Sequence, residues 1–146
     1  MSTTANRPDK LQLLYMILCD DVRLEVGNKL SLMGVFQNIA VQQMPVALFK
    51  FAVIGHWQGE GSYLSEVRVL TPDRSHVLAA QQPTRFDVEA GGAADNISFF
   101  FNVQLAAPGQ YWVQTLIDST LFDERPLTVI DLSVAGRPDD ASESVN

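Results

Sequence analysis

Cysteine, histidine and catalytic motifs are scarce in this chain, and each scarcity excludes a class of function. The single cysteine, Cys19, cannot form an internal disulfide, so the fold does not depend on an oxidising compartment. With two histidines, His56 and His76, the chain lacks the four ligands of a structural zinc site. A Gly-x-Ser-x-Gly elbow and a glycine-rich phosphate loop with its lysine are both absent. Catalysis is therefore the least supported class, and no cofactor is predicted.

Clustered positive charge is also missing. The ten lysine and arginine residues are dispersed, no two are adjacent, and the formal net charge is −7. A surface that follows a phosphate backbone needs grouped basic side chains, as does electrostatic docking on an anionic membrane. The sequence predicts neither nucleic acid nor a membrane as a partner.

Long hydrophobic runs are absent as well. The most apolar segment, Leu11–Cys19, falls short of the roughly 20 residues that span a bilayer. It is followed by Cys19-Asp20-Asp21, which lacks the small residues of a signal-peptide cleavage site. Apolar side chains occur at both odd and even positions, which predicts a strand buried on both faces. These features favour a cytoplasmic location and an unreactive Cys19 thiol.

What the chain does contain is period-two hydrophobic alternation, which places alternate side chains on one face of a strand. Ile97–Leu105 and Tyr111–Ile117 show it most clearly, and it predicts inward-facing Phe99 and Phe101. The 146 residues suit one domain, since domains most often have roughly 100–150 residues. We expect disordered tails at 1–9 and 136–146 and one domain over 10–135.

Turn signals separate the alternating segments at intervals of about ten residues, which is typical of all-β domains. The sequence predicts eight or nine strands in a two-sheet antiparallel β-sandwich, either immunoglobulin-like or jelly-roll. The predicted connections are a hairpin at Gly27-Asn28, a bulge or bend at Gly34, turns at 58–61, 71–74 and Asp118-Ser119, and a flexible loop at 90–95.

Three carboxylates form the first candidate site. Asp20, Asp21 and Glu25 lie at the end of an apolar strand, and crowded carboxylates can hold a hard cation such as calcium. The alternative is that they end strands, cap turns and pair with Arg23 or Lys29.

His56 and Trp57 form the second candidate site, beside the predicted turn at 58–61. A tryptophan next to a histidine can stack on a sugar or another planar ligand. However, Trp57 has the same parity as Phe49, Phe51 and Val53, which predicts that the core takes Trp57 and that His56 faces outward.

The third candidate site is a partner interface. Tyr111, Val113 and Ile117 are predicted to face inward, which leaves Trp112, Gln114 and Leu116 on the opposite face. Exposed aromatic residues are typical of protein–protein contacts. The alternative is that a neighbouring loop or strand covers Trp112 within the chain.

Several segments together resemble a bacterial family of small domains without an assigned function. They are the block LYMILCDDVRLEVGNKLSLMG from Leu14, FAV at 51–53, Trp57, VRVL at 67–70, Pro72-Asp73 and PGQY at 108–111, and the most specific run is CDDVRLEVGNKLSLMGVF, which begins at Cys19. The resemblance covers most of residues 12–132. It implies a cytosolic bacterial protein with a related sandwich fold, and no functional residue is carried over from it. The Pro-Gly-x-Tyr strand also resembles immunoglobulin-like modules, which concerns fold rather than chemistry.

These observations favour a non-enzymatic protein-interaction or self-assembly module, most simply a homodimer that uses Trp112 and Leu116. The alternative is a module that binds a cation or a carbohydrate through loops at one end of the sandwich, around Asp20, Asp21 and His56.

Overall fold

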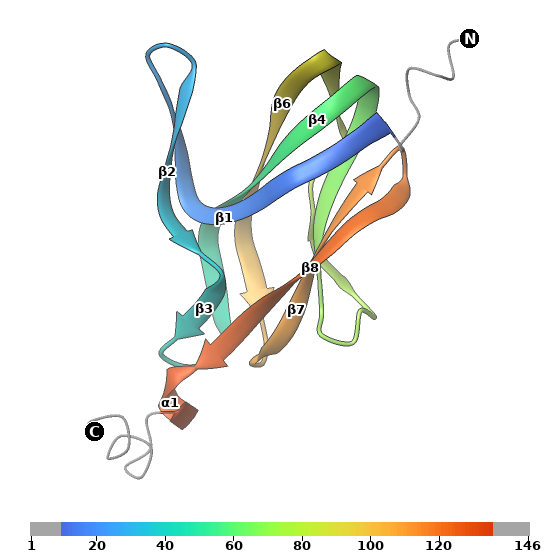
Figure 1. The fold of residues 1–146 in the computed structure, drawn as a ribbon. Helices are drawn as coiled ribbons and strands as arrows, with labels where there is room; N and C mark the ends of the chain where they lie inside the picture. Colours follow the sequence, from blue (N-terminus) through green and yellow to red (C-terminus); the bar gives the residue numbers. More distant parts are fainter. Residues whose placement is uncertain (1–9, 136–146) are drawn as a thin grey trace.

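The computed structural model describes residues 10–135, which form a domain built almost entirely of strands (Figure 1). This confirms the predicted all-β class, and the predicted tails at 1–9 and 136–146 lie outside the described residues. Eight strands precede one helical turn: β1 (Leu11–Glu25), β2 (Lys29–Phe36), β3 (Asn38–Val41), β4 (Val46–Leu70), β5 (Val77–Ala80), β6 (Thr84–Leu105), β7 (Gly109–Ile117), β8 (Thr120–Asp131) and α1 (Leu132–Ala135).

The strands belong to a single curled sheet rather than two separate sheets. The hydrogen-bonded order is β2-β1-β4-β7-β8-β3, and β5 and β6 also pair with β4. The sheet bends into a half-barrel around its core, and β3 runs parallel to β8. The predicted two-sheet antiparallel sandwich is therefore corrected to one mixed, curled sheet.

The correction has a local cause at the glycines of β4. Instead of turning at 58–61, the chain continues, and the register between β4 and β6 shifts between Gly59 and Gly61. One bent strand thus pairs with β1 at its first half and with β7 at its second half. Residues 90–95, predicted to be a flexible loop, belong to β6 instead, and Gly92 to Asp95 of this segment pair with β4. Glycine here bends a strand that it was predicted to end.

The core lies inside the curl and contains most of the residues predicted for it. Phe51, Val53, Trp57, Tyr63 and Tyr111 are all almost fully buried. Burying one large apolar side chain contributes roughly 1.5–3 kcal/mol to folding. The remaining members of the main clusters are mostly valine, leucine and phenylalanine from β4, β6, β7 and β8.

Three phenylalanines predicted to face inward lie outside this core. Phe49, Phe99 and Phe101 are 76%, 39% and 59% exposed. In β6 it is Phe100 that faces the core, where its ring stacks on that of Phe51 with 5.2 Å between centroids. Asn102 has a φ of 53°, outside the extended range. The buried positions change parity at this residue, from Phe100 before it to Val103 and Leu105 after it, while the register with β4 stays the same.

Among residues 10–135, the structure has no helix that is both apolar enough and long enough to span a bilayer.

Candidate functional site

The outer face of the layer formed by β1, β4 and β6 carries a row of exposed apolar side chains. Direct pairing across these strands sets Ile17 opposite Ile54 and Ile54 opposite Ile97, while Ala52 lies opposite Phe99 and Lys50 opposite Phe101. Residues directly opposite in a sheet project from the same face. We call the half-buried and exposed members of this row the outer patch: Tyr15, Ile17, Ile97, Phe99 and Phe101.

Aromatic contacts fix the side chains of the outer patch. The rings of Phe99 and Phe101 stack with 6.4 Å between centroids, and the Lys50 ammonium lies 5.1 Å from the Phe99 ring centroid. At the other end, the Tyr15 ring stacks on the His56 imidazole at 4.8 Å. The patch therefore combines ordered aromatic surface with incomplete burial, the combination that is enriched at protein interfaces.

The structure separates the second predicted pair of site residues. His56 faces outward, as predicted, and its Nδ1 lies 2.6 Å from Oδ1 of Asp95 across the β4–β6 pairing. Trp57 is 1% exposed and packs against Phe86 and Phe122 in the core, as its parity predicted. Its Nε1 is buried without a hydrogen-bond partner within residues 10–135. The two rings thus lie on opposite faces of β4.

A small buried cluster lies beside the outer patch, where the β1–β2 hairpin folds back over the sheet. Cys19, Ala52 and Ile54 are at most 1% exposed, and Val22 and Leu32 of the hairpin pack against them. Burial raises the pKa of the Cys19 thiol, so the thiolate form is disfavoured. The prediction of a buried cysteine is confirmed.

The three carboxylates predicted to hold a metal have different surroundings. Asp21 accepts a 2.9 Å hydrogen bond from the Lys50 ammonium, which lowers the pKa of the Asp21 carboxyl. Glu25 lies opposite Lys29 near the tip of the hairpin, and Asp20 lies over Gly34. Across the described part of the chain, no group of three His, Cys, Asp or Glu side chains is placed to hold a metal ion. The structure does not bring these carboxylates together.

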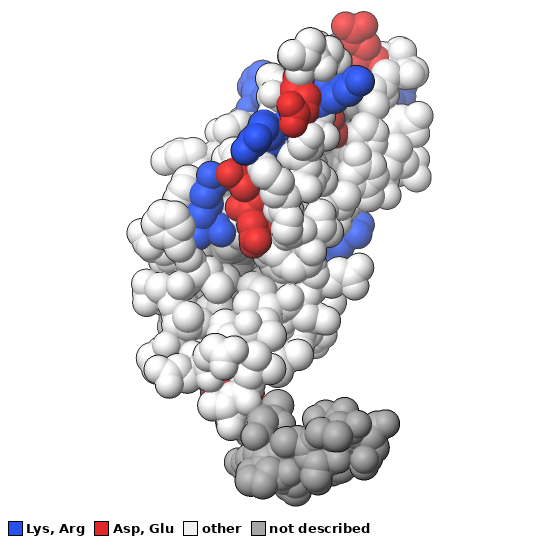
Figure 2. Space-filling view, turned by 90° about the vertical axis from the view of Figure 1, so that its left-hand side faces the viewer, with Lys and Arg blue, Asp and Glu red and all other residues white. Residues whose placement is uncertain are grey.

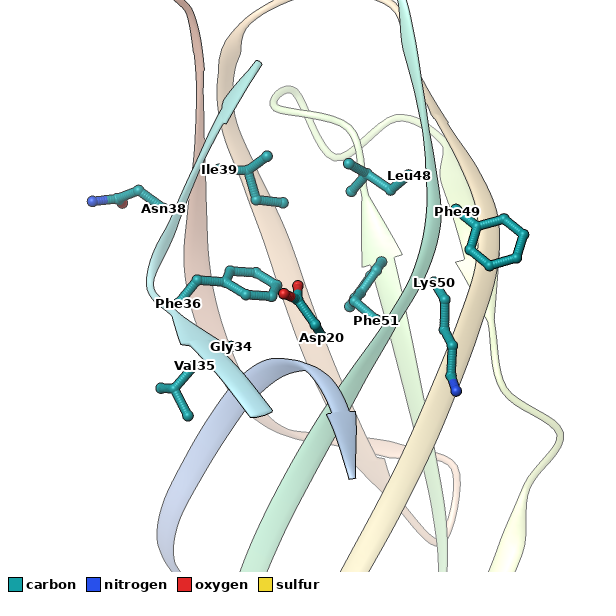
Figure 3. Close-up of a pocket in the computed structure, with 10 residues that line it drawn as sticks. All are labelled: Asp20, Gly34, Val35, Phe36, Asn38, Ile39, Leu48, Phe49, Lys50 and Phe51. Carbon is teal, nitrogen blue, oxygen red and sulfur yellow. The ribbon is translucent and has the colours of Figure 1, made fainter. Parts of the chain in front are cut away.

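A groove separates the first half of β4 from the β2–β3 segment (Figure 3). Its volume is about 430 Å³. Phe36 and Ile39 project from one wall toward Leu48 and Phe51 on the other, and the Asp20 carboxylate lies between the walls. Sequence patterning did not predict this groove, because it depends on where β1 separates from β4.

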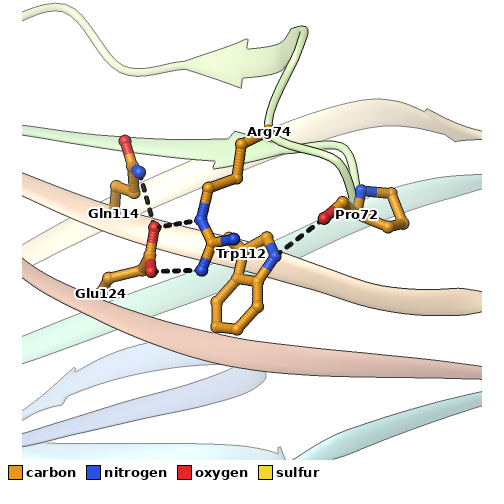
Figure 4. Close-up of polar contacts among 5 residues, drawn as sticks. All are labelled: Pro72, Arg74, Trp112, Gln114 and Glu124. Carbon is orange, nitrogen blue, oxygen red and sulfur yellow. Dashed lines mark hydrogen bonds and ion pairs between the residues drawn. The ribbon is translucent and has the colours of Figure 1, made fainter.

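The predicted interface around Trp112 is largely covered by the chain itself (Figure 4). The Arg74 guanidinium lies 3.8 Å from the Trp112 ring centroid, and the indole Nε1 donates a 3.1 Å hydrogen bond to the Pro72 carbonyl. Gln114 and Leu116 are 6% and 8% exposed. A neighbouring loop, residues 71–76, thus covers Trp112, which is the alternative that the sequence left open.

Charged hydrogen bonds hold the loop at 71–76 against β7 and β8. Arg74 donates two hydrogen bonds to the Glu124 carboxylate, at 2.9 and 2.7 Å, and Gln114 donates a third at 2.7 Å. These hydrogen bonds lower the pKa of Glu124 to about 2. Paired charges of this kind stabilise the loop over one face of the Trp112 ring, and Trp112 is half-buried as a result.

The outer patch was missed because the alternation was extended through Asn102 without a change of face. A signal was present: Phe99, Phe100 and Phe101 are consecutive, and adjacent strand residues point to opposite faces. At least one of the three had to face outward. The metal prediction at Asp20, Asp21 and Glu25 and the ligand prediction at His56 and Trp57 stay predictions.

Two solved structures show distant similarity to this chain. The alkylpurine DNA glycosylase AlkC of Pseudomonas fluorescens, bound to DNA containing an abasic site analogue, has a TM-score of 0.49 and 7% identity over 83% of this chain and 30% of its own. A β-glucosidase of Listeria innocua in complex with glucose has a TM-score of 0.45 and 12% identity over 64% of this chain and 15% of its own. The chain spans less than a third of either protein, and neither similarity supports an argument about function.

No curated protein matches the sequence. A family model does match: the family of unknown function DUF6941, over residues 14–130. This range includes the hairpin block beginning at Leu14, the bent strands β4 and β6, and the outer patch on β1 and β6. The chain therefore belongs to the family of unknown function DUF6941.

Proposed function

We propose that this domain is a non-enzymatic self-assembly module, and that two copies associate through the outer patch. The observation that carries the proposal is the exposed, stacked pair Phe99 and Phe101 on the outer face of β6, beside the β1–β2 hairpin. Stacking fixes the two rings in the free chain, so less side-chain entropy is lost on association.

The chemistry of the patch fits a protein contact. Aromatic side chains dominate the energy of interfaces, especially where less critical contacts surround them and exclude water. Here Ile17 and Ile97 continue the apolar surface, and the pairs His56–Asp95 and Lys50–Asp21 border it. The polar groups at the border are already paired, so covering them leaves few unsatisfied charges.

Charge balance favours a second copy as the occupant. A net charge of −7 opposes the approach of two copies in general. Beside the patch, however, three acidic residues of the hairpin region are matched by three basic ones: Asp20, Asp21 and Glu25 against Arg23, Lys29 and Lys50. Figure 2 shows blue and red alternating along one side of the molecule. A two-fold contact brings the same surface of both copies together, and alternating signs make such a surface self-complementary.

The proposal places the interface on β1, β4 and β6 rather than around Trp112. The loop at 71–76 already covers the Trp112 ring, whereas Phe101 is 59% exposed and no other loop of residues 10–135 is shown against its ring.

Sedimentation velocity on the full chain tests this proposal over a wide range of concentration. We expect a dimer for the wild type and a monomer for Phe101→Asp, with the dissociation constant raised roughly tenfold or more because a charge replaces a central aromatic contact. The matched control is Leu121→Asp, a 51% exposed leucine of β8 outside the patch, which keeps the dimer. A monomeric wild type, or a Phe101→Asp dimer as stable as the wild type, would refute the proposal.

A further inference from the structure

Part of β4 has a strand neighbour on one side only. The strand pairs with β6 from Val46 onward, whereas its pairing with β1 begins at Ala52, opposite Cys19. Beyond that point β1 bends away toward the hairpin with β2. Among the described strands, residues 46–51 therefore have a free edge, where alternate backbone N–H and C=O groups lack a strand partner.

This free edge is one wall of the groove in Figure 3. Six residues of edge extend for about 20 Å, enough to pair with a short extended segment. The groove volume of about 430 Å³ lies within the roughly 300–1,000 Å³ typical of binding sites. The half-buried side chains of Phe36, Ile39 and Leu48 supply apolar surface for the side chains that such a segment would point inward, and the buried Phe51 ring packs behind Phe36.

Asp20 gives the groove its charge. Its carboxylate lies over Gly34, between the two apolar walls (Figure 3), and it has no hydrogen bond or ion pair with any residue from 10 to 135. Lys50 lines the same groove, but its ammonium is bound to Asp21 and lies over Phe99. The Asp20 carboxylate, which would bind a lysine or arginine side chain best, is thus unpaired among the described residues and lies beside an apolar surface.

We propose that this groove binds an extended peptide segment of a partner protein, which adds a strand to the free edge of β4 at 46–51 and places a basic side chain against Asp20. Backbone hydrogen bonds supply general affinity in strand addition, and the pockets for alternate side chains supply selectivity. The groove is separate from the outer patch, so this binding does not depend on self-association through Phe101.

Peptide selection on the full chain tests the proposal. The probe is a phage-displayed library of random dodecapeptides. Selected peptides are expected to alternate apolar and polar residues around one lysine or arginine. When the same library is selected against the Asp20→Lys variant, we expect peptides with an acidic residue in place of that lysine or arginine.

Binding of the best peptide, made synthetically, is then measured by fluorescence anisotropy. Asp20→Asn, which keeps the size of the side chain, is expected to weaken binding about tenfold. The control Asp87→Asn, on an exposed carboxylate of β6, and the dimer variant Phe101→Asp are both expected to leave it unchanged. N-methylation of alternate peptide amides is expected to abolish binding, because it removes the donors for β4 while keeping the side chains.

Other outcomes overturn the proposal. If the selection enriches no peptide, or enriches peptides that lack basic residues, a basic extended segment is excluded as the occupant of the groove. Binding that survives N-methylation excludes strand addition. If Asp20→Asn abolishes self-association while no peptide binds, the groove is occupied by a second copy instead.

Discussion

Trp112 illustrates how single residues decide whether a surface is available. Its indole donates to the Pro72 carbonyl and its face is covered by Arg74, which is itself held by Glu124. Cation–π contacts of this kind contribute about 0.5–1 kcal/mol at exposed sites. The parity of Trp112 was predictable from the sequence. The loop that covers it was not, because Arg74 reaches it from a different strand connection.

The pH dependence of stability tests the ion pair at Glu124. Its pKa in the folded chain is about 2, below the ordinary value of 4.5. The unfolded chain therefore takes up the proton first as the pH falls, and the stabilisation is lost between about pH 4.5 and pH 2. We expect Glu124→Gln to lower the free energy of unfolding by about 0.5–1 kcal/mol near neutral pH, a small effect because the pair is partly solvated. The difference in the free energy of unfolding between this variant and the wild type should vanish toward pH 2.

Urea unfolding at a series of pH values measures this difference. Glu89→Gln, on an exposed carboxylate of β6, is the control and is expected to leave the pH profile unchanged. A Glu124→Gln profile parallel to that of the wild type would contradict the assigned role of the ion pair.

At the scale of elements, bends in long strands determine where the surfaces lie. The Gly27-Asn28 hairpin and the Asp118-Ser119 turn were predicted and are present. At Gly34, where a bulge or bend was predicted, the backbone has a positive φ of 67° and the register between β1 and β2 does not shift. The glycines at 59 and 61 were misinterpreted, because a glycine permits both a reversal and a bend, and only pairing with β6 decides between them.

The bend of β1 at Asp20 depends on the glycine across from it. Gly34 has a φ of +67°, and a Cβ there would collide with the Asp20 carboxylate. We expect Gly34→Ala to destabilise the domain by about 2 kcal/mol or more, since the backbone cost alone is roughly 1–2 kcal/mol. The double variant Asp20→Ala/Gly34→Ala should recover the part that comes from the collision.

Gly91→Ala provides a matched control for this prediction. Gly91 also has a positive φ, +76°, but a Cβ there meets nothing within 4 Å, so only the backbone cost applies. Thermal unfolding of the four variants and the wild type measures the coupling. Strictly additive effects of Asp20→Ala and Gly34→Ala would contradict the steric account.

At the scale of the molecule, the local hydrophobic pattern was sufficient to predict the all-β fold class and most of the core. It was not sufficient to predict how the two halves of the curled sheet are connected. Alternation identified Phe51, Val53, Trp57 and Tyr111 as buried, since it depends only on neighbouring residues. Two features depend on contacts between residues that are distant in sequence. One is the pairing of β4 with both β1 and β7, and the other is the parallel pairing of β3 with β8. The groove and the outer patch both follow from these distant contacts.

For the proposed dimer, the curled sheet provides an acidic chain with an apolar face and balanced charges beside it. Folding gathers Phe99, Phe101 and Tyr15 on one face and places a charge-balanced hairpin beside them. The net charge of −7 is therefore carried mainly elsewhere on the chain.

Hydroxyl-radical footprinting of the full chain at low and high concentration tests the outer patch most directly, because it reports the solvent access of individual aromatic side chains. We predict that oxidation of Tyr15, Phe99 and Phe101 falls as the chains associate, while oxidation of Trp112 stays constant. Loss of oxidation at Trp112 without any change at Phe99 and Phe101 would contradict the account.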